Sequence, residues 1–177
     1  MTIAGRFEAF LLEFQDMVFA TALRLLGNPA EAEDVAQTVF LKAFERFGEL
    51  DGNPSAPGWL KTVATNECLN HLARYRKRWS FFADAPENPG RWTHLRQGSG
   101  GQVLSDLEQQ ADYAALDAAL RALPASQRVP IVLFHFDELS YQQIAERLKV
   151  SISKVKTDIH RGRETLRAVL TNDGSRR

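Results

Sequence analysis

Basic and hydroxyl side chains gather in the last third of the chain, where they could contact DNA. They lie between residues 149 and 163, around Val155 and Ile159, which are one helical turn apart and would face a core. Lysine can reach guanine O6 and N7, threonine can touch a thymine methyl, and arginine often binds phosphates. Side chains of these types could together recognise a nucleic acid. The candidates are Ser153, Lys154, Lys156, Thr157, His160, Arg161 and Arg163.

The preceding segment predicts a partner helix for this basic helix. Ser140 is expected to cap it, with Gln143 as the capping-box partner, and Val150 would fill the corner between the two helices. A short helix, a tight turn and a basic helix form the helix-turn-helix arrangement, which places the second helix in a DNA major groove. The alternative is a helical hairpin whose basic residues only solvate its surface. The apolar face of the first helix would be Ile144, Ala145 and Leu148.

Charge is distributed unevenly along a chain whose net charge is zero. Residues 1–55 hold four Lys or Arg and nine Asp or Glu, which gives a net charge of −5. Residues 140–177 hold nine Lys or Arg and four Asp or Glu, which gives a net charge of +5. The basic end suits phosphates, and the acidic front suits a protein partner with a basic surface. Two ordinary solvated surfaces are the alternative for the front half.

Helical spacing recurs through the chain, and no convincing strand appears. The 177 residues allow one domain or two small ones. A first helix should stop at Gly27, and Asn28 and Pro29 should open a second. Residues 48–58 read as a loop, about 59–78 as a third helix, and the Pro- and Gly-rich stretch after Trp79 as a flexible linker.

We therefore predict an all-α protein of two small helical bundles, with a first domain at 1–80, a flexible linker at 81–110 and a helix-turn-helix domain at 111–177. The single cysteine, Cys68, excludes an internal disulfide and is expected in the core. No signal pattern and no apolar run of membrane-spanning length is seen, so a cytoplasmic location is expected.

Enzymatic and metal chemistry finds no support in the sequence. Ser151 and Lys154 match Ser-x-x-Lys, but helix capping explains the serine. The glycine-rich stretch 98–101 is not followed by the Lys-Ser/Thr of a phosphate loop. The four histidines show no ligand spacing. We expect no catalysis, cofactor, metal or small-molecule substrate.

Three segments resemble parts of the extracytoplasmic-function (ECF) group of bacterial RNA polymerase sigma factors, in the sigma-70 family. Residues 28–40 resemble the acidic helix by which region 2 binds the polymerase β′ clamp, residues 59–66 resemble its promoter-melting helix, and residues 139–163 resemble region 4. They occur in the family's order and spacing. The resemblance implies a factor that binds core RNA polymerase at the β′ clamp and β flap, recognises promoter DNA, and is often held by an anti-sigma factor.

The resemblance assigns the third helix to the minus-ten promoter element. Asn66 lies where the family reads an extruded base, with the 48–58 loop closing over it. Trapping unstacked bases requires a stacking surface and cations for the backbone. The alternatives are a core role for Trp59, an exposed polar face for the asparagines and a solvated helix end for the cations. The candidates are Trp59, Lys61, Asn66, Asn70, Arg74, Arg76, Lys77 and Arg78.

Polymerase binding is assigned in the same way to Glu33, Asp34 and Gln37. Acidic residues in a first turn are also what any helix prefers, so only the resemblance supports this role.

In the basic helix, this sequence departs from the family at two positions. The family often has a small or hydroxyl residue at the position of Lys154 and a basic residue at the position of Asp158. Asp158 could accept a hydrogen bond from cytosine N4 or pair with Lys154 one turn back, and we favour the pair.

The competing prediction is a stand-alone helix-turn-helix regulator whose N-terminal bundle senses a signal or dimerises. Such a protein binds DNA without polymerase, usually as a dimer on a two-fold site. The segment that resembles a melting helix argues against it.

Overall fold

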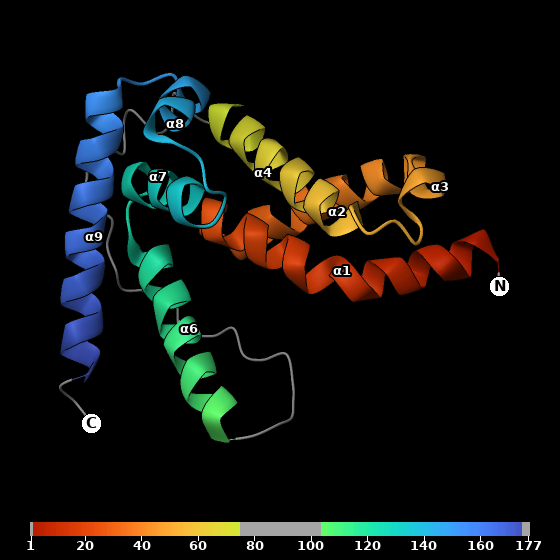
Figure 1. Cartoon of the computed structure of the whole chain (residues 1–177), viewed down its shortest axis with the longest axis horizontal. Helices are drawn as coiled ribbons and strands as arrows, with labels where there is room; N and C mark the ends of the chain where they lie inside the picture. The colour runs from red at the N-terminus through yellow and green to blue at the C-terminus, as the bar shows by residue number, and fades with distance from the viewer. Residues whose placement is uncertain (1, 75–103, 175–177) are drawn as a thin grey trace.

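The computed structural model describes residues 2–74 and 104–174, and the side chains of residues 2–74 and 113–172. All regular structure in this part of the chain is helical (Figure 1), which confirms the predicted all-α class. The helices are α1 (Ile3–Leu26), α2 (Pro29–Glu45), α3 (Phe47–Leu50), α4 (Ala56–Arg74), α6 (Leu104–Ala122), α7 (Ala125–His135), α8 (Tyr141–Leu148) and α9 (Ile152–Gly174).

The first bundle packs α1, α2 and α4 against one another. Helix α1 ends at Gly27, whose φ of 69° is left-handed, and this tight ending turns the chain into α2. The Asn28 side chain accepts hydrogen bonds from the backbone of Ala30 and Glu31, and Pro29 is the first residue of α2, as predicted. Val18, Leu25, Val39, Leu60 and Cys68 are among the side chains that fill its core.

The 48–58 loop is shorter in the structure than predicted. Helix α3 occupies its beginning, because Phe47 and Leu50 bury their side chains, and α4 already starts at Ala56. Asn53 stabilises the remaining turn: its side chain accepts from the backbone N–H of Ser55 and donates to the carbonyl of Glu49.

The second bundle places α7 against α9 and α8. Ser140 and Gln143 form the predicted capping box at the start of α8. Pro130 is the sixth residue of α7, deeper in the helix than its first turn. Gly162 of α9 faces α7 so closely that a Cβ there would lie 2.3 Å from Ile131 Cδ1.

The two bundles pack onto each other through α1 and α7 (Figure 1). Arg128 of α7 is buried and donates hydrogen bonds to the carbonyls of Leu25 and Leu26, at the end of α1, and of Leu123. The last carbonyls of a helix have no donor within it, so this guanidinium satisfies them. The structure thus shows the two bundles joined.

The segment predicted as a linker, 81–110, is helical in its last part, because α6 begins at Leu104. Its other residues, 81–103, lie outside the described part of the chain.

Candidate nucleic-acid interface

Helices α8 and α9 form the predicted helix-turn-helix. Helix α8 ends at Lys149, a left-handed residue with a φ of 56°, and Ser151 then accepts a hydrogen bond from the backbone of Lys154 to cap α9. Val155 and Ile159 are buried beneath α9. The exposed candidates for the minus-thirty-five element are Ser153, Lys154, Lys156, Thr157, His160 and Arg161.

Lys154 and Asp158 form the ion pair that we favoured from the sequence. The Lys154 ammonium lies 2.7 Å from the Asp158 carboxylate, one turn along α9. The carboxylate is mostly buried, with 12% of its side chain exposed, while half of the lysine side chain is exposed. In this arrangement Lys154 is held against its own helix, with its charge partly balanced.

Arg163 differs from the other basic residues of α9, because it contacts α7. Its guanidinium lies over the Phe134 ring, 5.4 Å from the centroid, and comes within 3.1 Å of His135 Nε2. Burial, together with the neighbouring Arg163 charge, lowers the pKa of His135. These contacts hold α9 on α7, so Arg163 has a packing role that the sequence did not reveal.

Helix α4 carries the candidates for the minus-ten element. Asn70 and Arg74 are exposed near its end. Trp59 is half-buried against the core, and the Arg46 guanidinium lies 5.9 Å from the centre of its indole. Arg76, Lys77 and Arg78 lie outside the described residues.

Three polar residues of α4, Lys61, Thr65 and Asn66, contact the second bundle. Lys61 Nζ donates to the Phe136 carbonyl at 2.6 Å and lies 3.6 Å from the Asp137 carboxylate. The Thr65 hydroxyl donates to the same carboxylate at 3.2 Å. These partners are 72 to 76 positions apart in the sequence, so no local pattern could have revealed them.

A third contact engages Asn66, the residue expected to read an extruded base. Arg147 of α8 donates from Nη1 to the Asn66 side-chain oxygen at 2.6 Å. Thr65, Asp137 and Arg147 are therefore members of this site that sequence reasoning missed. The helical spacing of the sequence gives no signal for them, because they meet only when the bundles pack.

Asp137 is the most perturbed carboxylate of this group. Burial raises its pKa, and the nearby Lys61 ammonium and Thr65 hydroxyl oppose that rise. Only 12% of its side chain is exposed. The carboxylate is thus held away from water by the packing of α4 against the turn that follows α7.

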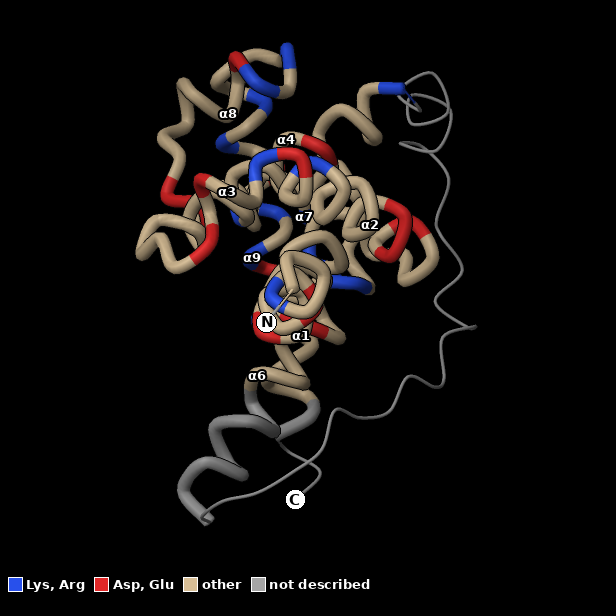
Figure 2. The backbone as a smooth tube through the Cα atoms, turned by 90° about the vertical axis from the view of Figure 1, so that its right-hand side faces the viewer, with Lys and Arg blue, Asp and Glu red and all other residues tan. Residues whose placement is uncertain are grey.

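Helix α2 presents the acidic candidates, and Figure 2 shows acidic positions along its tube and basic positions on α8 and α9. Glu33, Asp34 and Gln37 are exposed, whereas Val35 and Val39 are buried, as expected of core residues. Two large apolar side chains follow on the exposed surface: Leu41 is 68% exposed and Phe44 is 53% exposed. The α2 surface therefore combines charge with apolar area, as protein-binding surfaces do.

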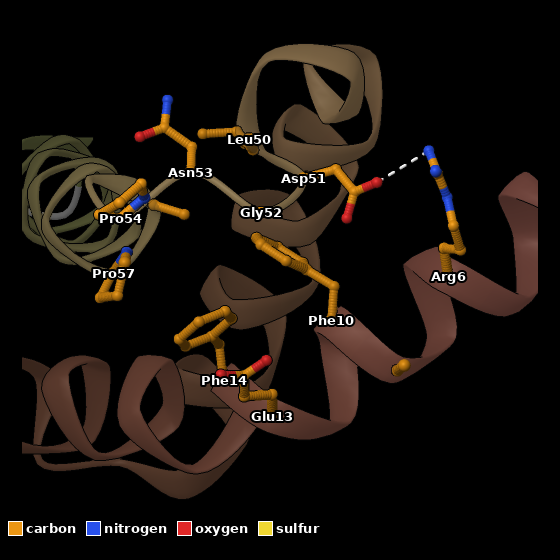
Figure 3. A pocket seen from close by; sticks show the side chains of 12 residues that line it. Arg6, Phe10, Glu13, Phe14, Leu50, Asp51, Gly52, Asn53, Pro54 and Pro57 are labelled. Atoms are coloured by element: carbon orange, nitrogen blue, oxygen red, sulfur yellow. Dashed lines mark ion pairs between the residues drawn. The ribbon is translucent and has the colours of Figure 1, made fainter.

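A hollow of about 480 Å³ lies between α1 and the turn before α4 (Figure 3). Phe10 and Phe14 form its floor, and the ion pair between Arg6 and Asp51 closes one side. Asn66, the residue expected to read an extruded base, does not line this hollow.

Among the described residues, no group of three or more His, Cys, Asp or Glu side chains is placed to hold a metal ion. No helix in that part of the chain is long and apolar enough to cross a membrane.

Comparison with known proteins places two family regions on these bundles. Residues 10–78 match Sigma-70 region 2, and residues 113–166 match Sigma-70 region 4. The chain is 31% identical over 158 residues to the ECF RNA polymerase sigma factor SigW of Bacillus subtilis, covering 89% of this chain and 84% of that protein. It is 33% identical over 168 residues to the ECF RNA polymerase sigma factor SigE of Mycolicibacterium smegmatis, covering 95% of this chain and 63% of that protein.

A similar fold occurs in a solved structure, that of the sigma factor RpoE in complex with the anti-sigma factor NepR from Bartonella quintana. The TM-score is 0.51 at 24% sequence identity, and the match covers 93% of this chain and 96% of that chain.

Proposed function

Because the chain belongs to the extracytoplasmic-function sigma factors of the sigma-70 family, we propose that α2 docks it on core RNA polymerase and that α4 and α9 read the promoter. Sigma factors of this family bind core RNA polymerase and promoter DNA and initiate transcription. The observation that carries the assignment is the order of regions 2 and 4 on two helical bundles. A stand-alone helix-turn-helix regulator is not favoured, because region 2 would have no place in it.

At the minus-ten element, α4 opens the duplex by holding unstacked bases rather than by making a covalent bond. Asn66 and Asn70 supply amides that can hydrogen-bond a base edge, and Trp59 supplies a ring for stacking. Lys61 and Arg74 hold the backbone of the same strand through its phosphates. Arg76, Lys77 and Arg78 would extend this basic track.

At the minus-thirty-five element, α9 lies in the major groove. Thr157 and Lys156 reach base edges, and Arg161 binds a phosphate that fixes the register of the helix. Lys154 contributes to base reading only if its pair with Asp158 rearranges, since the two side chains are bound to each other at 2.7 Å. Ser153, His160 and Arg163 complete the proposed surface.

Transcription with purified bacterial core polymerase tests the function. The template is a supercoiled library of genomic promoter fragments, read by run-off and abortive products. We expect discrete start sites that depend on the added chain. Absence of any start site, together with a footprint on a symmetric DNA site by the chain alone, would instead identify an ordinary DNA-binding regulator.

The docking role of α2 is tested by reversing its charge. Replacing Glu33 and Asp34 by lysine should weaken binding to core polymerase by about tenfold or more, since like charges would then face a basic surface. The matched control replaces Glu13 and Asp16, which are exposed acidic residues of α1. The affinity of each double variant for core polymerase is measured by fluorescence titration. An equal loss of affinity in the two double variants would contradict a specific docking role for α2.

An anti-sigma partner is the second protein contact that we propose. The RpoE sigma factor of similar fold was solved in complex with the anti-sigma factor NepR. Affinity purification of this chain from its native cells should yield a second protein besides polymerase. Recovery of polymerase alone, under conditions in which its promoters are silent, would contradict this partner.

A further inference from the structure

We propose that this chain binds a small amphipathic acid, an apolar chain that ends in a carboxylate, in a hollow between α4, α7 and the α8–α9 corner (residues 147–150). The hollow has a volume of about 430 Å³, within the range of about 300–1,000 Å³ that is usual for ligand pockets. It shares no lining residue with the hollow beside α1. The proposed promoter function assigns no ligand to it.

The walls of this hollow are mostly apolar. Val129 of α7 is buried and forms its inner side. Leu69 and Leu72 line it from α4, and Leu148 and Val150 line it from the α8–α9 corner. These four side chains pack against the core but are only partly buried. An apolar ligand that covers them removes apolar surface from water, which is the main favourable term in binding of this kind.

Positive charge gathers at the outer edge of the same hollow. Arg147, Lys149 and Lys154 line it and are exposed, while Asp158 is the one acidic residue among the lining side chains. The lining side chains therefore carry three positive charges and one negative charge, a net charge of +2. An anionic group is favoured at this edge over a neutral or a cationic group.

The guanidinium of Arg147 is the group best suited to hold a carboxylate there. Its Nη1 donates to the side-chain oxygen of Asn66, a neutral amide that leaves the guanidinium charge uncompensated. The Nε and Nη2 donors lie parallel on the other side of the planar group, and such a pair matches the two oxygens of a carboxylate. Lys154 is different, because its ammonium is bound to Asp158 at 2.7 Å.

Other classes of small molecule fit the hollow less well. A sugar or a nucleotide needs several hydrogen-bonding groups around its body, and Ser126 supplies the one hydroxyl among the lining side chains. An amine would face the net positive edge, and a neutral hydrocarbon would gain nothing from it. An alkyl chain with a terminal carboxylate satisfies the apolar walls and the charged edge together.

Calorimetric titration of the full chain with decanoate tests the proposal. Decanoate is used below the concentration at which it forms micelles, and decyltrimethylammonium presents the opposite charge on the same alkyl chain. We expect saturable binding of one decanoate per chain, about tenfold or more tighter than that of decyltrimethylammonium. Absence of saturable decanoate binding, or equal affinities for the two amphiphiles, would overturn the proposal.

Two substitutions of exposed alanines locate the bound molecule. Ala73 lines the hollow at the end of α4, so Ala73→Trp should fill part of it and weaken decanoate binding about tenfold or more. Ala118→Trp makes the same change on α6, outside the hollow, and should bind decanoate as wild type does. Circular dichroism shows that each variant keeps its helices. Equal affinities of the two folded variants would place decanoate elsewhere and refute this site.

Substitutions of Arg147 test the contact with the carboxylate. Arg147→Met removes the charge and should weaken decanoate binding about tenfold, while the binding of decanol, which has no carboxylate, should stay unchanged. Arg147→Lys keeps the charge without the paired donors, so its affinity for decanoate should lie between the two. Unchanged decanoate binding by Arg147→Met, or equal losses for decanoate and decanol, would show that the arginine does not hold the acid and would contradict the proposal.

Discussion

At the scale of the residue, Gly27 shows how one backbone position allows the bundles to meet. Its φ of 69° is left-handed, and a Cβ there would lie 2.7 Å from the guanidinium carbon of Arg128. A side chain at this position would strain the backbone and displace the cation that satisfies the end of α1.

We therefore expect Gly27→Ala to lower the free energy of unfolding by about 1–2 kcal/mol from the backbone, and further through Arg128. Gly58→Ala is the matched control, because nothing lies within 4 Å of its Cβ position and it lies inside α4, where alanine stabilises by up to about 1 kcal/mol. Chemical denaturation followed by circular dichroism measures both. Equal stability of Gly27→Ala and wild type would contradict the assigned contact.

Cys68 gives a second prediction at this scale, because burial raises the pKa of its thiol to about 12, with smaller contributions from Asp137 and Glu67. The folded protein favours the protonated thiol, so the thiolate fraction at pH 8 is about a thousandfold below that of a cysteine with an ordinary pKa of 9.0. Alkylation by iodoacetamide should be slow up to about pH 11 and complete in guanidinium. Rapid modification of the native protein at pH 8 would contradict the burial of Cys68.

Residues with local partners were predictable from the sequence, and those with distant partners were not. Asn28 caps α2, Ser140 and Gln143 form a capping box, and Lys154 pairs with Asp158, because each partner lies within four positions. Lys61 meets its partners only across the two bundles. A helical period contains no information about such a contact.

At the scale of the element, the helices followed from apolar spacing, while their exact bounds depended on tertiary packing. Helix α3 forms because Phe47 and Leu50 enter the core, although glycine and proline nearby suggested a loop. Arg163 was predicted as a DNA contact from its place on the basic helix, but packing of α9 on α7 brings it over Phe134. The sequence therefore predicted which helices carry the candidate surfaces, but only some of the side chains that are exposed on them.

The close contact of α9 with α7 is itself testable. Gly162→Ala would place a Cβ 2.3 Å from Ile131 Cδ1, and overpacking of this kind costs about 1–3 kcal/mol. Ile131→Val removes that carbon, so the double variant should be less destabilised than the sum of the single variants by about 1 kcal/mol. Thermal denaturation of the three variants measures this coupling. Additive effects would show that the two residues do not meet.

At the scale of the whole molecule, the acidic α2 and the basic α9 suit different partners, polymerase and DNA (Figure 2). The sequence predicted this division from its charges of −5 and +5 at the two ends. It did not predict that the bundles would pack together and that Lys61, Thr65 and Asn66 would contact the second bundle. That arrangement depends on Arg128 and Asp137, and neither residue belongs to a sequence motif that would reveal its distant partners.

The measurement that tests this account most directly is permanganate reactivity of promoter thymines in complexes with core polymerase. Wild type should expose thymines near the start site, because α4 holds the opened strand. The variant with Asn66→Ala and Asn70→Ala should bind core polymerase equally but leave those thymines protected, while Thr62→Ala, an exposed change on the same helix, should behave as wild type. Equal opening by the double variant, or none by wild type, would contradict the role of α4.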